Sequence, residues 1–257
     1  MDILYTISGF TVGFIVGLTG VGGGSLMTPL LVLVFGIVPA TAVGTDLLYA
    51  AITKMGGVWV HGRRSNVDWK IVGLLALGSL PASLTTVWVL KRFAAETAQF
   101  NSLITSTLGI ALILTALVLI FRERLQKFVK HHAGELWHER HPVPATVATG
   151  LLLGMLVTIS SVGAGALGVA ALTFLYPRLT AVKTVGTDIA HAVPLTAVAG
   201  LGHMTLGTVD LTLLASLILG SLPGIYLGSH VSTQISEHTL RQVLASMLVL
   251  IGGRLVW

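Results

Sequence analysis

Four ionisable side chains lie inside apolar stretches of this sequence that are long enough to cross a membrane. They are Asp46, Lys54, Asp188 and His191. A titratable group within a bilayer is costly, so each of these residues is a candidate functional position. Asp46 and Asp188 could each carry a proton, or could instead cap a helix or pair with Lys54. Lys54 follows Asp46 by eight residues, about 12 Å along one helix, so we expect Lys54 to contact a different helix.

Two further histidines, His61 and His203, end apolar stretches at matching positions. Each could act as a gate or a proton relay, or could hold a loop at the membrane surface. His191 follows Asp188 by three residues, which places the two on one helix face. Together these residues form the set of candidate coupling or gating residues: Asp46, Asp188, Lys54, His61, His191 and His203.

A glycine-rich interruption occurs twice within the apolar sequence, at 20–25 and at 160–165. Glycine interrupts helices and lets the backbone approach a ligand closely. A helix that starts at such a break directs free N–H groups into it, which suits an anion; tight helix packing is the alternative. No strand–helix unit or P-loop lysine follows, which excludes a nucleotide site. The candidate substrate-binding residues are Thr19, Gly20, Gly22, Gly23, Gly24, Ser25, Thr45, Ser160, Ser161, Gly163, Gly165 and Thr187.

The composition indicates what kind of structure holds these residues. Hydrophobic residues make up 54% of the 257 residues and charged residues 10%, whereas a soluble domain carries about 25% charged residues. The net charge of +5 comes from loop residues and indicates membrane orientation rather than nucleic-acid binding. Cysteine is absent, which excludes disulfides and thiolate metal sites, and we expect no metal or cofactor. No HExxH motif or nucleophile elbow occurs in the spans, so we do not expect an enzyme.

The sequence contains two copies of one unit. Val43-Gly44-Thr45-Asp46 recurs 142 residues later as Val185-Gly186-Thr187-Asp188. Three more matches keep this offset: His61 with His203, Val67-Asp68 with Val209-Asp210, and Gly78-Ser79-Leu80-Pro81 with Gly220-Ser221-Leu222-Pro223. The two glycine-rich breaks match at an offset of 141. We therefore interpret the chain as an internal duplication.

Each copy has an apolar segment, the glycine break, a shorter apolar segment and three longer spans. The predicted segments are 3–19, 25–37, 41–60, 69–90 and 101–121 in the first copy, and 143–160, 166–176, 184–203, 210–229 and 240–257 in the second. This order predicts three regions: a first transmembrane repeat at 1–121, a cytoplasmic basic linker at 122–142 and a second transmembrane repeat at 143–257.

The distribution of lysine and arginine predicts how the two copies are oriented. Loop 61–68 carries Arg63 and Arg64, and the linker carries five Lys or Arg residues, so both are expected in the cytoplasm. The matching loop 203–210 carries none and is expected outside, although Lys91 and Arg92 fall in a loop that this scheme also places outside. Equivalent loops on opposite sides indicate inverted repeats, a recurring plan of secondary transporters with the substrate near the midplane.

The sequence resembles the sulfite exporter TauE/SafE family, also called the toluene-sulfonate uptake permease family, over nearly its whole length. The resemblance rests on Gly17–Gly24 leading to Pro29, on Ala42-Val43-Gly44-Thr45, on the loop His61–Trp69, on Gly78-Ser79-Leu80-Pro81 and on the second-half copies. It implies transport of sulfur-containing anions across the cytoplasmic membrane. The residue after Gly-Thr, commonly serine in that family, is aspartate in both copies here.

We therefore expect an all-α polytopic membrane protein with two inverted repeats, each a broken-helix hairpin plus three transmembrane helices, giving about 8–10 membrane segments. The expected function is secondary transport of a small sulfur-containing anion such as sulfite, thiosulfate or an organosulfonate. The first alternative is an anion channel or passive facilitator. A membrane-embedded enzyme or assembly subunit is a second, less favoured alternative. The expected partners are a small anionic substrate and the lipid bilayer in the cytoplasmic (inner) membrane, with homo-oligomerisation left open.

Overall fold

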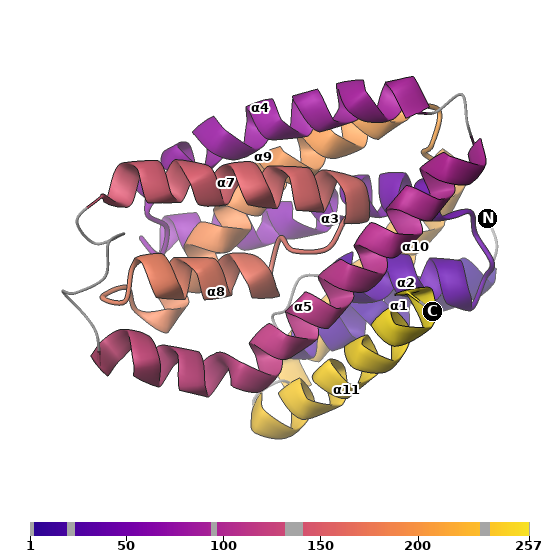
Figure 1. Cartoon of the computed structure of the whole chain (residues 1–257). Helices are drawn as coiled ribbons and strands as arrows, with labels where there is room; N and C mark the ends of the chain where they lie inside the picture. The colour runs from indigo at the N-terminus through magenta and orange to yellow at the C-terminus, as the bar shows by residue number, and fades with distance from the viewer. Residues whose placement is uncertain (1–2, 20–23, 94–96, 132–140, 232–236, 257) are drawn as a thin grey trace.

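A computed structural model describes residues 3–19, 24–93, 97–131, 141–231 and 237–256. Every regular element in these ranges is a helix, which confirms the all-α expectation (Figure 1). The first half contains α1 (Ile3–Thr19), α2 (Gly24–Leu33), α3 (Pro39–Arg63), α4 (Trp69–Phe93) and α5 (Thr97–His131). The second half contains α7 (Pro142–Ser160), α8 (Ala166–Leu175), α9 (Ala181–Thr205), α10 (Leu211–Val231) and α11 (Glu237–Val256).

The helix bounds follow the sequence offset between the two copies. Helices α3 and α9 have the same length, 25 residues, and begin 142 residues apart. Helices α4 and α10 also begin 142 residues apart, after Asp68 and Asp210. Each of these aspartates caps its helix: Asp68 Oδ1 accepts from Ile71 N at 3.3 Å, and Asp210 Oδ1 accepts from Leu213 N at 2.9 Å. The repeated Val-Asp pair therefore marks the start of a helix in both copies.

Helices from different halves pack in matching pairs. Helix α1 lies against α10, and its counterpart α7 lies against α4. These contacts are close because glycines allow the backbones to meet: a Cβ at Gly220 would overlap the Thr6 carbonyl oxygen, and one at Gly78 would overlap that of Val147. The same small-residue packing is common between membrane helices. These helix pairs thus join the two halves, which pack together along their helices.

Helices α3 and α9 pack against each other at the centre, and α5 pairs with α11 along one side of the molecule (Figure 1). The interior is largely apolar but also holds buried polar and ionisable groups, and large apolar side chains are exposed on the outside. Asp46, Asp188 and His203 are fully buried, whereas Leu77 on α4 and Leu250 on α11 are exposed. An apolar surface around buried ionisable groups suits a lipid environment, where such groups face the interior.

Among the described residues, four helices are long and apolar enough to cross a membrane. They are Trp69–Arg92, Gln99–Arg122, Pro142–Ser160 and Leu211–Gly228. Shorter apolar helices are Ile3–Leu18, Ala166–Leu175 and Leu244–Leu255. The central helices α3 and α9 have sufficient length but carry the buried Asp46, Asp188 and His191, which lowers their apolar character. These observations support a multi-pass membrane protein.

Helix α5 is longer than the span predicted at 101–121. It continues to His131 and so includes the first ten residues of the predicted linker. The added stretch is rich in Arg, Glu, Gln and Lys, which favour the helix without being apolar. Residues 132–140, the remainder of the linker before His141, lie outside the described residues.

Candidate functional site

The helix break between α7 and α8 meets the middle of α3. Helix α7 ends at Ser160, and Ser161 adopts a left-handed conformation with φ 59°. The hydroxyl of Ser161 donates to Asp46 Oδ2 at 2.9 Å, and the hydroxyl of Thr28 on α2 donates to the same oxygen. The other carboxylate oxygen of Asp46, Oδ1, is buried and has no hydrogen-bond partner among the described residues. Asp46 on α3 thus binds both α2, through Thr28, and the segment before α8, through Ser161.

Lys54 reaches the same break two turns further along α3. Its ammonium group donates to the carbonyl oxygen of Ala164, so Lys54 contacts a different helix region and not Asp46 through its own helix. The ammonium also interacts electrostatically with Asp188 and Asp46. The lysine therefore stabilises a main-chain carbonyl that the break leaves without a helical partner.

Asp188 on α9 lies against the first turn of α8. A Cβ placed on Gly168 would overlap Asp188 Oδ1, so only glycine allows this approach. Asp188 is 2% exposed and interacts electrostatically with Lys54. A carboxylate at the start of a helix is favoured by the partial positive charge there. The N-terminus of α8 therefore already faces one carboxylate of the protein itself.

The backbone of the break combines two glycines that no other residue type would replace without strain. Gly163 has φ 123° and Gly165 has φ 156°. The Gly163 carbonyl accepts from Gly165 N at 2.9 Å and from Gly168 N at 3.0 Å. The amides of Ala166 and Leu167, which begin α8, find no main-chain acceptor among the described residues. Free amides of this kind can donate to an anion.

A second polar pair crosses between the halves next to this cluster. Ser79 Oγ on α4 and His191 Nε2 on α9 are 2.8 Å apart and fully buried. At the equivalent positions, Tyr49 on α3 lies near Ser221 on α10, and both are buried. The serine of the repeated Gly-Ser-Leu-Pro motif therefore faces a ring side chain of the other half in both copies.

The structure places His203 against the last turn of α7 and His61 near the end of α3. His203 is buried, with Nδ1 2.8 Å from Thr208 Oγ1 and Nε2 2.9 Å from the Thr158 carbonyl oxygen. His61 is half-buried, and its Nδ1 has no hydrogen-bond partner among the described residues. The matched histidines thus differ: His203 joins a loop and α7 to α9, while His61 leaves one ring nitrogen unused.

Thr45 and Thr187, predicted to bind substrate, also lie at the junction between the halves. Thr45 Oγ1 accepts from Asp210 N at 3.0 Å, and Thr187 Oγ1 accepts from Asp68 N at 3.0 Å. The adjacent glycines explain how the chains come so close, because a Cβ on Gly44 would overlap the Thr208 carbonyl oxygen. The repeated Gly-Thr pair therefore holds the loop of the opposite half.

Part of the predicted substrate site lies at the other break, between α1 and α2. Gly20, Gly22 and Gly23 lie outside the described residues. Thr19 is the last residue of α1, and Gly24 and Ser25 begin α2. In the second half, Ser160 Oγ donates to the Leu156 carbonyl at 2.7 Å and accepts from Val162 N at 3.2 Å, so it stabilises the end of α7.

The sequence did not indicate the roles of Thr28 and Gly168 beside the two aspartates or of Ser79 beside His191. Ser79 belonged to a repeated motif, which was a usable signal. Nothing in the sequence singled out Thr28 or Gly168, because Thr28 belongs to no repeated motif and Gly168 is one of 30 glycines. Their roles follow from contact with the two aspartates, which only the tertiary structure brings about.

Several known proteins match this chain over nearly its full length. The profile of the family described as sulfite exporter TauE/SafE matches residues 5–255. The probable membrane transporter protein YjnA of Bacillus subtilis is 38% identical over 256 residues, covering 100% of both chains. The probable membrane transporter proteins YunE of Bacillus subtilis and MJ0441 of Methanocaldococcus jannaschii are each 26% identical, over 99% and 97% of this chain and 97% and 93% of theirs.

No solved structure gives a significant match. The family profile covers nearly every residue, and the relatives named above are membrane transporters by description. The apolar exterior and the buried ionisable centre agree with this assignment. The chain therefore belongs to the sulfite exporter TauE/SafE family and is a membrane transporter.

Proposed function

We propose that this protein is a secondary transporter that moves a small sulfur-containing anion, such as sulfite, thiosulfate or an organosulfonate, across the cytoplasmic membrane. The observation that carries the proposal is the polar cluster at the α7–α8 break, where Asp46, Lys54 and Asp188 surround backbone that is not helical. Irregular backbone at membrane depth is tolerated where it is buried in protein or lines a cavity. In transporters such broken helices hold the substrate.

Charge balance in this cluster supports coupling of the anion to protons. Asp46, Asp188 and Lys54 together carry one excess negative charge when all three are ionised, so an anion would be repelled. Protonation of one carboxyl group neutralises the cluster, so that the positive charge of Lys54 and the α8 amides can attract the anion. A proton and an anion would then enter the site together. A channel would need no such linkage.

The first experiment measures uptake by proteoliposomes that contain the purified protein. Radiolabelled sulfite, thiosulfate and sulfoacetate are offered with and without an inward proton gradient. We expect one of these anions to accumulate above its outside concentration only when the gradient is present. Equilibration without accumulation under both conditions would instead support the channel or passive facilitator.

The second experiment tests the break itself with two glycine variants. Gly163→Ala places a side chain at φ 123° within the break, and Gly207→Ala places one at φ 70° with no atom within 4 Å. Both variants therefore strain the backbone, but only the first alters the proposed site. We expect at least a tenfold loss of substrate affinity in Gly163→Ala and little change in Gly207→Ala, with folding checked by elution in detergent. Equal affinities in the two variants would contradict a substrate site at this break.

The proposal includes an inverted arrangement of the two halves. It is supported by the arginines of the α3–α4 loop, which have no counterpart in the α9–α10 loop, and by the matching helix pairs. Ser65 and Thr205 are exposed at these two loops, and the chain has no native cysteine. Single cysteines at the two positions should react with a membrane-impermeant maleimide from opposite sides. Reaction of both from one side would exclude inversion.

A further inference from the structure

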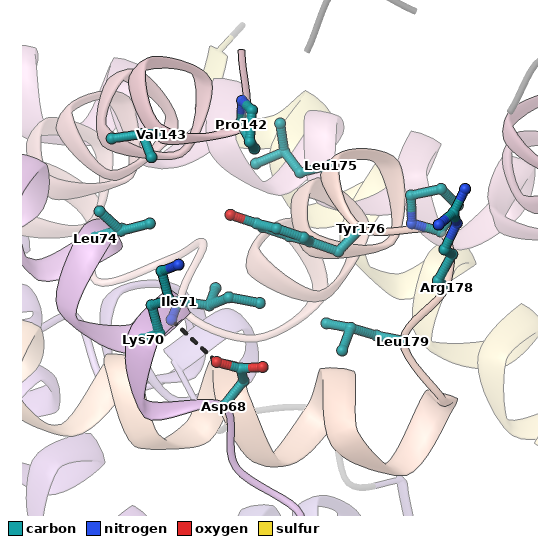
Figure 2. A pocket seen from close by; sticks show the side chains of 11 residues that line it. Asp68, Lys70, Ile71, Leu74, Pro142, Val143, Leu175, Tyr176, Arg178 and Leu179 are labelled. Carbon is teal, nitrogen blue, oxygen red and sulfur yellow. Dashed lines mark hydrogen bonds between the residues drawn. The ribbon is translucent and has the colours of Figure 1, made fainter. Parts of the chain in front are cut away.

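A cavity of about 440 Å³ lies at one end of the helices, apart from the break cluster. The start of α4, the start of α7 and the segment that joins α8 to α9 enclose it (Figure 2). This volume lies within the range of small-molecule sites, about 300–1,000 Å³. None of the residues that line the cavity belongs to the Asp46, Lys54 and Asp188 cluster. The cavity is therefore a separate candidate site.

Apolar side chains form most of the wall. Leu74, Val143, Leu175 and Leu179 surround the opening, and the ring of Tyr176 extends across its middle (Figure 2). The Tyr176 hydroxyl is 2.6 Å from Thr146 Oγ1, so the ring is held in place from α7. An apolar wall with a fixed aromatic ring suits a ligand that has a hydrocarbon portion.

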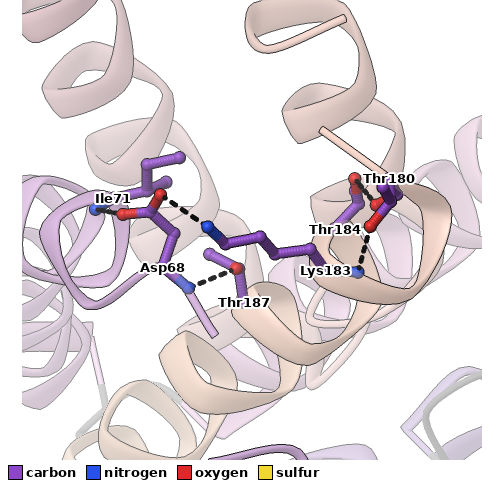
Figure 3. A network of polar contacts seen from close by, with 6 residues as sticks. All are labelled: Asp68, Ile71, Thr180, Lys183, Thr184 and Thr187. Atoms are coloured by element: carbon purple, nitrogen blue, oxygen red, sulfur yellow. Dashed lines mark hydrogen bonds and ion pairs between the residues drawn. The ribbon is translucent and has the colours of Figure 1, made fainter. Parts of the chain in front are cut away.

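The charged residues of the cavity have an excess of positive charge. Lys70 and Arg178 lie on either side of Tyr176 (Figure 2). Asp68 is the acidic lining residue, and Lys183 compensates it, with the Lys183 ammonium 3.5 Å from Asp68 Oδ2 (Figure 3). Asp68 also caps α4 through Ile71 N, so its carboxylate is already engaged. Lys70 and Arg178 are left to attract an anionic group.

The three basic residues have uncharged counterparts in the other half. At the offset of 142, Thr212 stands where Lys70 does, Gly36 where Arg178 does and Thr41 where Lys183 does. Phe35, near the same corner of the first half, packs edge-on against Tyr5 with ring centroids 5.0 Å apart. Packing at this corner of the fold therefore needs no cation. Orientation in the membrane accounts for basic residues in these loop regions, and the position of Lys70 and Arg178 around the cavity also makes them available to an anionic ligand.

We propose that this cavity binds an anionic amphiphile, a molecule with a phosphate or sulfonate head and a short apolar body. Lys70 and Arg178 attract the head, and the apolar body lies along Leu74, Leu179 and the Tyr176 ring. The exposed Trp69 beside Lys70 suits a position at the membrane surface, where tryptophan is enriched. The ligand could be a phospholipid of the bilayer or a soluble amphiphile, because both present this chemistry.

The soluble source is tested by calorimetric titration of the protein in nanodiscs of phosphatidylcholine with octyl phosphate and octanesulfonate. We expect saturable binding of at least one probe, weakened at least tenfold in the double variant Lys70→Gln/Arg178→Gln. Leu74→Trp should also prevent binding by filling the cavity without changing its charge. Lys91→Gln removes an exposed lysine at the other end of α4 and should bind as the parent does.

The lipid source is tested by native mass spectrometry after reconstitution with phosphatidylglycerol. Retention of this lipid by the parent protein and its loss in Lys70→Gln/Arg178→Gln and in Leu74→Trp would identify a bilayer lipid as the ligand. The proposal is overturned if neither probe nor lipid binds, or if the cavity variants bind as well as Lys91→Gln. It is also overturned if Gly163→Ala prevents binding while Leu74→Trp does not, since the anion would then occupy the break.

Discussion

Helices α3 and α9 occupy equivalent positions and have equal length, yet the environments of their aspartates differ. Asp46 accepts hydrogen bonds from Thr28 and Ser161. Asp188 lies against Gly168 at the start of α8 and near Lys54. The two halves therefore have the same acidic residue at equivalent positions, but different residues contact it in each half. We infer that Asp46 has the more structural role and Asp188 the more chemical one.

The contrast extends to the neighbours of the aspartates. Lys54 on α3 corresponds to Thr196 on α9, whose hydroxyl donates to the Ala192 carbonyl of its own helix at 2.8 Å. Tyr49 on α3 corresponds to His191 on α9. By contrast, Thr45 and Thr187 make the same contact in both halves. The contacts that assemble the fold are symmetric, and the groups that could do chemistry are not.

The largest effect is expected for Lys54→Met. The two aspartates would lose a nearby cation and the Ala164 carbonyl its donor, and removal of one partner from a buried ionic group costs about 3–5 kcal/mol. Uptake by proteoliposomes should fall more than 100-fold. The matched variant Thr196→Val, at the equivalent position of α9, should keep uptake within about threefold. The unfolding temperature of the double variant Lys54→Met/Asp188→Asn should lie closer to that of the parent than the unfolding temperature of Lys54→Met does. Uptake near the parent level in Lys54→Met would show that α3 and α9 do not differ as inferred.

The next effect separates the two aspartates from each other. Asp188→Asn should abolish accumulation driven by a proton gradient while it retains exchange of substrate, because the amide cannot take up a proton. Asp46→Asn places an amide near two hydroxyl donors and should lower thermal stability, by about 1–3 kcal/mol for an impaired buried hydrogen-bond site. Uptake with varied internal and external pH, together with unfolding curves, measures both. Equal effects of Asp46→Asn and Asp188→Asn on proton-driven uptake and on stability would contradict the different roles inferred for the two aspartates.

A smaller effect is expected at the matched histidines. His203→Ala removes the ring that contacts the buried Thr158 carbonyl and the Thr208 hydroxyl, so it should destabilise the protein by about 1–3 kcal/mol. His61→Ala removes a half-buried ring with an unused nitrogen and should cost less than about 1 kcal/mol. Unfolding followed by circular dichroism in detergent compares them. A larger cost at His61 would contradict the assignment of the structural role to His203.

The smallest effect tests the symmetric part of the comparison. Thr45→Val and Thr187→Val each remove one hydrogen bond to the backbone of the opposite half, worth about 1 kcal/mol. The two variants should lower stability by similar amounts, and the double variant by about their sum, since the contacts are separate. Denaturation of the single and double variants gives the comparison. A loss confined to one of the two would show that the halves are not joined symmetrically.

The helices could be predicted from sequence because they depend on local patterns. Apolar runs, glycine breaks and polar loops determine where a helix starts and ends, and the predicted 3–19 and 166–176 closely match α1 and α8. The expected end at residue 121 was less accurate for α5, because charged helix formers extend a helix beyond the apolar run. The repeated Val-Gly-Thr-Asp motif indicated equivalent positions without showing what they contact.

Local sequence patterns were enough to place Asp46, Lys54 and Asp188 in long helices and to predict a glycine break after α7. The packing of the helices brings the α7–α8 break alongside α3, so that Ser161 reaches Asp46 and Ala164 reaches Lys54. These partners are 115 and 110 residues apart. Contacts over such separations depend on how each helix is rotated and which helices cross, and that is set by the packing of whole helices, which local sequence patterns do not encode.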